Sequence, residues 1–126
     1  MKPKFTTQLA WEQAQVLMQP ALIRILDNIR QFLEESPWQG TYHETQVPVP
    51  GYQLYLELGH RTHSIDIWEL CYQVCFLNYQ STHTPTEVRE VEIDTSLFEE
   101  GELDWERLDE KAKSIVQQIF LNLQNE

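Results

Sequence analysis

The segment YQLYLELGHRTHSIDIW, residues 52–68, carries the pattern that decides the fold. From Tyr52 to Leu58, leucines alternate with residues that are polar or can face water, as in a strand that buries one face. The residues from Gly59 to Thr62 favour a tight turn, and a second extended segment runs from His63 to Trp68. The pattern therefore predicts an antiparallel hairpin in the middle of the chain.

Three further segments on either side of this hairpin have strand character. Residues Thr41 to Val47 form one of them, and the turn-forming run from Pro48 to Gly51 separates it from the hairpin. Residues Leu70 to Tyr79 are apolar on both faces, which is typical of a central strand, although a short helix near Glu69–Cys71 is also compatible. Residues Val88 to Ile93 carry alternating charges and indicate a strand at a sheet edge.

A helical pattern precedes the strands, from about Thr7 to Glu35. Pro20 lies in its middle, where a proline ring clashes with the carbonyl four residues earlier. Because the apolar spacing keeps its phase across Pro20, one kinked helix fits better than two helices, with a second helix starting at Pro20 as the alternative. The stripe predicted to be buried recurs at three- and four-residue steps and consists of Trp11, Ala14, Met18, Leu22, Ile25, Leu26, Ile29, Phe32 and Leu33.

A second helical pattern follows the strands and begins near Asp104, whose carboxylate can accept bonds from the first-turn amides. We therefore predict a single α+β domain over residues 1–126, with an antiparallel sheet of four to five strands and both helices packed on one face. The predicted buried stripe of the second helix is Trp105, Leu108, Ala112, Ile115, Val116, Ile119, Phe120 and Leu123.

The composition narrows the classes of partner. The net charge of −11 and the nine scattered basic residues disfavour binding to nucleic acid, since that binding depends on Lys and Arg neutralising phosphates. No apolar run approaches the ~20 residues that span a bilayer, so membrane insertion is not expected. The N-terminus lacks the features of a secretory signal, and two cysteines are too few for a disulfide scaffold. We therefore predict a cytoplasmic location.

The sequence contains no motif that identifies a catalytic or cofactor-binding site. The four glycines are too dispersed for a phosphate-binding loop, and neither a nucleophile elbow nor a His-Glu-x-x-His motif is present, so no catalytic residue and no cofactor is assigned. His60 and His63, with Asp66, resemble metal ligands in type, but solvated turn residues explain them better. Cys71 and Cys75 lie ~13 Å apart if their segment is a strand, so we expect reduced core thiols.

The charge is concentrated in one part of the chain. Residues 87–110 contain eleven acidic residues and two arginines, a balance of −9. The acidic segment does not match an EF-hand calcium loop in either of two alignments, because residues that cannot bind calcium fall at the ligand positions. Two explanations remain open, a solvated acidic surface and a docking face for a basic partner protein. The candidate interaction residues are Glu99, Glu100, Glu102 and Glu106, together with Tyr55, whose phase opposes that of the neighbouring leucines.

Two family resemblances bear on function. Trp11–Gln15, Pro20–Arg30 and Val91–Leu97 together resemble a group of small cyanobacterial proteins of unknown function, and this likeness implies no activity. Size, acidity and mixed α+β content are also similar to those of type III secretion chaperones. That family places a helix between its third and fourth strands, where this sequence offers only the region Glu69–Cys71.

Two hypotheses of function follow. The first is a non-catalytic interaction module, an adaptor or chaperone-like protein that binds another protein through the acidic residues. Such a module can also form a homodimer if a helix stripe is wider than the sheet can cover. The second is a small-molecule binder or enzyme with a pocket between the N-terminal helix and the sheet.

Overall fold

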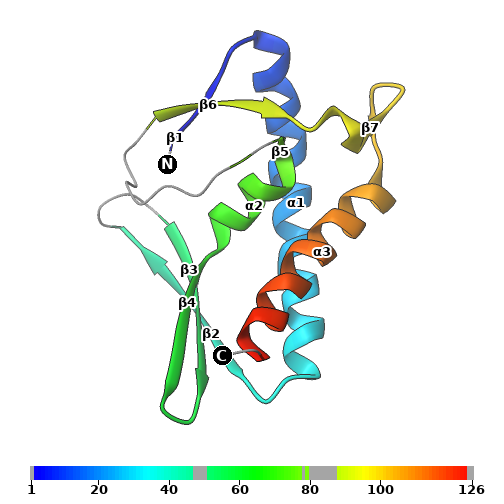
Figure 1. Cartoon of the computed structure of the whole chain (residues 1–126). Coiled ribbons are helices and arrows are strands. Elements are labelled where there is room, and N and C mark those ends of the chain that lie inside the picture. Colours follow the sequence, from blue (N-terminus) through cyan, green and yellow to red (C-terminus); the bar gives the residue numbers. More distant parts are fainter. Residues whose placement is uncertain (1, 47–50, 78, 80–87, 125–126) are drawn as a thin grey trace.

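The computed structural model describes residues 2–46, 51–77, 79 and 88–124, which form three α-helices and eight short strands (Figure 1). In chain order the elements are β1 (Lys2–Phe5), α1 (Gln8–Glu34), β2 (Gln39–Thr45), β3 (Gly51–Leu58), β4 (Arg61–Asp66), α2 (Ile67–Cys75), β5 (Phe76–Leu77), β6 (Val88–Ile93), a 3₁₀ turn (Thr95–Leu97), β7 (Phe98–Glu99), β8 (Glu102–Leu103) and α3 (Trp105–Gln124). Of the turn predicted from Pro48 to Gly51, only Gly51 belongs to the described residues, and it is the first residue of β3.

The predicted hairpin is confirmed as β3 and β4, and β2 completes an antiparallel sheet in the order β2-β3-β4. Gly59 opens the two-residue turn with φ 61°, a conformation that glycine adopts without steric cost. Leu54 and Leu56 are buried, whereas Tyr55 and Glu57, which alternate with them, are exposed. The alternation in the sequence therefore reports directly which face of β3 is covered.

One helix, α1, runs through Pro20 without a break. Its N-cap is Thr7, whose side chain accepts a bond from the amide of Ala10 at 3.0 Å. The buried face includes Ala14, Ile25 and Ile29 as predicted, but the prediction for Trp11 is wrong, because that side chain is exposed. Helical phase alone therefore does not show whether a residue in the first turns of α1 is covered.

The strand predicted over residues 70–79 is wrong in its first half, which is the helix α2. Asp66 caps this helix and accepts bonds from the amides of Trp68 and Glu69 at 3.0 and 3.4 Å. Within α2 the buried positions are Ile67, Leu70, Cys71, Val74 and Cys75, which recur at helical spacing. Because Trp68 and Tyr72 widen the apolar surface beyond this stripe, the segment gives no clear period and resembles a central strand.

Because α2 is a helix, the wide separation expected on a strand does not explain why the two cysteines are unpaired. Cys71 and Cys75 are four residues apart on a helix, and both are free and buried. Burial raises the pKa of each thiol to about 12, and the neighbouring Cys75 adds to the increase at Cys71. Since the thiolate is the reactive form, burial and this pKa make both side chains inert at neutral pH.

Thiol labelling should show this directly. At pH 8 we expect almost no reaction of the native protein with an aromatic disulfide reagent, and two equivalents per chain once the protein is unfolded. Rapid labelling of either cysteine in the native protein would contradict the buried position of α2.

A second sheet joins the N-terminal end of the chain to its middle. Its order is β1-β6-β5, with β1 parallel and β5 antiparallel to β6. The prediction that Val88–Ile93 is an edge strand is wrong, because β6 lies at the centre of this sheet. One side of β6 faces solvent, which explains its alternating charges. Val88, Glu90 and Glu92 on that side are exposed, whereas Val91 and Ile93 on the other side are buried.

The C-terminal helix α3 begins at the predicted position. The carboxylate of Asp104 accepts a bond from the amide of Arg107 at 3.1 Å. Five predicted positions are buried, but the prediction for Trp105 is wrong, because this side chain is 55% exposed. At the other end of α3, the guanidinium of Arg61 donates to the carbonyl of Leu123 at 3.1 Å and lies over the ring of Trp38.

The α+β class with flanking N- and C-terminal helices is confirmed, but the strands form two three-stranded sheets in place of one sheet of four to five. The three helices pack on one another, with the β1-β6-β5 sheet across their upper end and the β2-β3-β4 sheet beside their lower end (Figure 1). The rings of Phe32 and Phe120 stack at 5.6 Å between α1 and α3. Among the described helices, none combines the length and hydropathy needed to cross a bilayer.

Candidate protein-interaction surface

The acidic residues of the C-terminal third have different positions in the fold. Asp94 is the most buried acidic residue among those that the structure describes here, and it lies at the start of the 3₁₀ turn. The ammonium of Lys111 on α3 approaches its carboxylate at 2.7 Å, and the amide of Ser96 donates to it at 3.1 Å. Burial acts to raise the pKa of Asp94, but the bonds from Lys111 and Ser96 outweigh it and hold the pKa below its usual value. Asp94 therefore fixes α3 to the end of β6.

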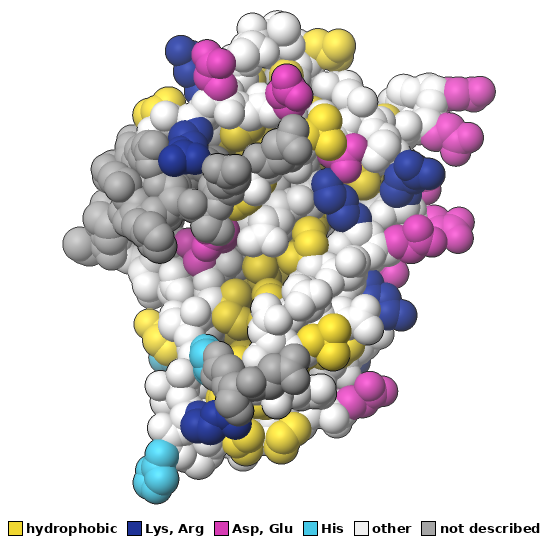
Figure 2. Space-filling view, in the orientation of Figure 1, with side chains coloured by type: hydrophobic (Ala, Val, Ile, Leu, Met, Phe, Trp, Pro, Cys, Tyr) yellow, Lys and Arg dark blue, Asp and Glu magenta, His cyan; other side chains and the backbone are white. Residues whose placement is uncertain are grey.

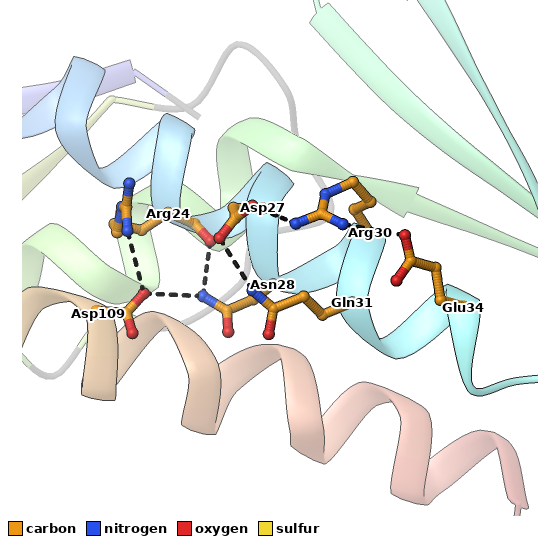
Figure 3. Close-up of polar contacts among 7 residues, drawn as sticks. All are labelled: Arg24, Asp27, Asn28, Arg30, Gln31, Glu34 and Asp109. Atoms are coloured by element: carbon orange, nitrogen blue, oxygen red, sulfur yellow. Dashed lines mark hydrogen bonds and ion pairs between the residues drawn. The ribbon is translucent and has the colours of Figure 1, made fainter.

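Asp109 has a structural role as well, at the interface of α1 and α3 (Figure 3). The side-chain amide of Asn28 donates to the Asp109 carboxylate at 3.2 Å and to the carbonyl of Arg24 at 2.8 Å. The guanidinium of Arg24 lies 3.7 Å from the same carboxylate. Asn28 is buried, and the bonds to Asp109 and to the carbonyl of Arg24 satisfy its side-chain amide.

With Asp94, Asp104 and Asp109 committed to the fold, the exposed charge near the start of α3 belongs chiefly to the glutamates named from the sequence. Glu99, Glu100 and Glu102 lie on the β7–β8 hairpin, and Glu106 lies in the first turn of α3. All four are exposed. Figure 2 shows acidic side chains protruding along the margin of the molecule that the hairpin and α3 form in Figure 1.

Two features of the β7–β8 hairpin are energetically unfavourable. Glu99 and Glu102 face each other directly across β7 and β8, and like charges in such a pair repel. Between them, Glu100 has φ 52°, the left-handed region in which glycine or asparagine is usual. Strain of this kind persists where the surrounding structure enforces it and is concentrated at binding sites.

A groove of about 450 Å³ lies between the hairpin and the start of α3. Trp105 is part of its lining and, as noted above, is largely exposed. Large aromatic side chains such as that of Trp105 contribute strongly to protein interfaces, because they bury much area at a small cost in conformational entropy. The surface of the groove is mainly polar and acidic, and Trp105 is the one aromatic residue among the residues that line it. Its lining consists of Glu99, Glu100, Glu102, Leu103, Asp104 and Trp105.

Tyr55 does not belong to this surface. It is exposed on the outer face of β3, where its ring contacts the edge of the His43 ring at a centroid distance of 4.9 Å. The β2-β3-β4 sheet and the β7–β8 hairpin lie at opposite ends of the molecule (Figure 1). The structure therefore brings the four glutamates together and leaves Tyr55 apart from them.

The two histidines considered as metal ligands have different surroundings. His60 is exposed in the β3–β4 turn, whereas His63 is half-buried with its ring 5.6 Å from that of Trp38. Asp66 is occupied as the cap of α2. Within residues 2–46, 51–77, 79 and 88–124, no group of three or more His, Cys, Asp and Glu side chains is arranged to hold a metal ion.

Between α1 and the β2-β3-β4 sheet, the structure is closely packed at Gly40. A methyl group added to Gly40 of β2 would lie 2.9 Å from Cδ1 of Leu33 and 3.2 Å from Cδ1 of Leu54. Two more clefts, of about 330 and 320 Å³, lie beside Trp68 and beside Leu77, and neither is lined by a residue of α1.

Comparison of the chain with protein-family models, curated proteins and solved structures found no match. Trp105 is the residue of this surface that sequence reasoning placed wrongly. The signal that could have identified it is its position, because it follows the cap Asp104 directly and lies within the acidic run, where the helix has only just begun.

Proposed function

We propose that the protein is a cytoplasmic, non-catalytic interaction module, an adaptor or chaperone-like protein that binds a basic segment of another protein at the β7–β8 hairpin. The observation that carries the proposal is the exposed Trp105 beside three glutamates whose arrangement is unfavourable in the free protein. A lysine or arginine placed between Glu99 and Glu102 would relieve their repulsion, and its aliphatic stem could lie on Trp105.

The order of elements supports the chaperone-like part of the proposal. Counted from the end of α1, three strands are followed by α2, then by β5 and β6, then by the short β7–β8 hairpin, and finally by α3. The position between the third and fourth of these strands is where type III secretion chaperones place a helix. The two free cysteines suit a reducing compartment.

Affinity capture from the source cells, with the purified chain immobilised, tests the proposal. The groove variant Glu99→Gln/Glu100→Gln/Glu102→Gln removes three charges, and the matched variant Glu12→Gln/Glu35→Gln/Glu57→Gln removes three exposed charges elsewhere. We expect one protein with a basic segment to be retained by the native chain and by the matched variant at low salt. It should be lost from the groove variant, and from the native chain at about 1 M salt, where the Debye length falls to ~3 Å.

Two results would speak against the proposal. Equal retention by the groove variant would place the binding surface elsewhere. Retention of no protein under either salt condition would remove the basis for an interaction module and would favour the small-molecule alternative.

A further inference from the structure

The solvent-facing side of α1 carries an apolar stripe that no described element covers. Leu9, Val16 and Ile23 are 63%, 52% and 47% exposed. They are spaced by seven residues, which is close to two helical turns and places all three on one side of the helix. The buried residues of α1, such as Leu17 and Ala21, lie on the opposite side.

This part of α1 is almost free of charge. Between Gln8 and Ile23 the sequence contains a single charged residue, Glu12, although the whole chain has a net charge of −11. Two copies of so acidic a protein repel each other over most of their surfaces. A face with almost no charge is where a second copy can approach at the lowest electrostatic cost.

The stripe ends where the same side of the helix becomes charged. Arg30 donates to Asp27 at 2.9 Å and to Glu34 at 3.0 Å, and Gln31 donates to Asp27 at 3.1 Å (Figure 3). The hydrogen bond from Arg30 is the largest cause that holds the pKa of Asp27 below its usual value. These charges satisfy one another at the surface, so this half of the face has no need of a partner.

We infer that two copies of the chain associate through this stripe, with their α1 helices antiparallel about a two-fold axis at Val16. In this arrangement Leu9 of one copy lies against Ile23 of the other, and Val16 packs on its own equivalent. Glu12 lies opposite Pro20. A parallel arrangement would instead place the two Glu12 carboxylates side by side, where they repel.

The contact is small. The helices overlap from Gln8 to Arg24, a length of about 25 Å at 1.5 Å per residue. Three half-exposed side chains from each copy cover less than the roughly 1,200 Å² of a stable complex. The dimer is therefore weak and depends on concentration. The helix α3 packs on the side of α1 that carries Asn28 and Phe32, away from the stripe.

Sedimentation equilibrium over a wide concentration range tests the association. We expect the weight-average mass to rise from monomer toward dimer, and Val16→Glu to weaken the dimer at least about tenfold by placing two charges on the axis. Gln15→Glu, which adds the same charge next to the stripe, should leave the mass unchanged. Val16 is half exposed, so the variant should keep the circular dichroism spectrum of the native chain. A monomer at every concentration would overturn the inference.

Disulfide crosslinking distinguishes the two orientations. With Val16→Cys, mild oxidation should link two copies, because the two positions meet at the axis, while the buried Cys71 and Cys75 do not react. Leu9→Cys should link poorly to itself but efficiently to Ile23→Cys when the two variants are mixed. Efficient self-linking of Leu9→Cys would contradict the antiparallel dimer.

Discussion

Replacement of Phe76 by alanine is expected to lower the free energy of unfolding by about 3–5 kcal/mol. Phe76 is 2% exposed and joins three elements. Its ring meets that of Phe5 in β1 at 5.9 Å and stacks on that of Tyr72 in α2 at 5.5 Å. Its backbone ends α2 and pairs with Ile93 of β6. Truncation would leave a cavity where the second sheet meets the helices.

Urea unfolding followed by circular dichroism measures this loss as a shift of the midpoint at an unchanged slope. The neighbouring Leu77 is 42% exposed and provides the control. Leu77→Ala should change the stability by less than ~0.5 kcal/mol. Similar losses for the two variants would mean that β5 does not have the orientation described.

Replacement of Asp94 by alanine is expected to cost about 2–3 kcal/mol. The variant loses the bonds from Lys111 and from Ser96, and it leaves the Lys111 ammonium partly buried without its carboxylate. The control is Asp27→Ala, which breaks an exposed ion pair with Arg30 and should cost clearly less than Asp94→Ala. A loss at Asp94 no larger than that at Asp27 would contradict the anchoring of α3 by this residue.

The contribution of Asp94 should also depend on pH in a defined direction. Its pKa is lower in the folded protein than the 3.8 of a free side chain, so folding favours the charged form. The stabilisation is therefore fully present above about pH 4 and is lost as the pH falls through the folded pKa. The difference in stability between the native chain and Asp94→Ala should stay constant from pH 5 to 7 and shrink below about pH 4. A difference that grows on acidification would have the wrong sign.

The elements with a clear period were predictable from the sequence. The alternation in residues 52–58, the cap Asp104 and the apolar stripes indicated β3, α1 and α3 to within a few residues. In α1 the phase of the stripe across Pro20 correctly indicated one helix. Local patterns suffice in these segments because each buries a single face.

The remaining features depend on tertiary context. The helix α2 was missed because its apolar surface is too wide to show a period, although Asp66 is a recognisable cap. The strand β1 pairs with β6 across more than 80 residues, and no local signal reports such a partner. Sequence alone also could not show which acidic residues stabilise the fold. Asp94 and Asp109 do so because basic and amide groups from distant parts of the chain donate hydrogen bonds to them.

Site-specific photo-crosslinking tests the role of the hairpin most directly. A photoreactive amino acid in place of Trp105 lies in the acidic groove, and the same amino acid in place of Tyr55 lies on the outer face of the distant sheet. Irradiation in the source cells should link position 105 to a protein with a basic segment, and the link should disappear when Glu99, Glu100 and Glu102 are changed to glutamine. Links formed at position 55 and not at position 105, or links at position 105 that survive the loss of the three glutamates, would contradict a binding site at the β7–β8 hairpin.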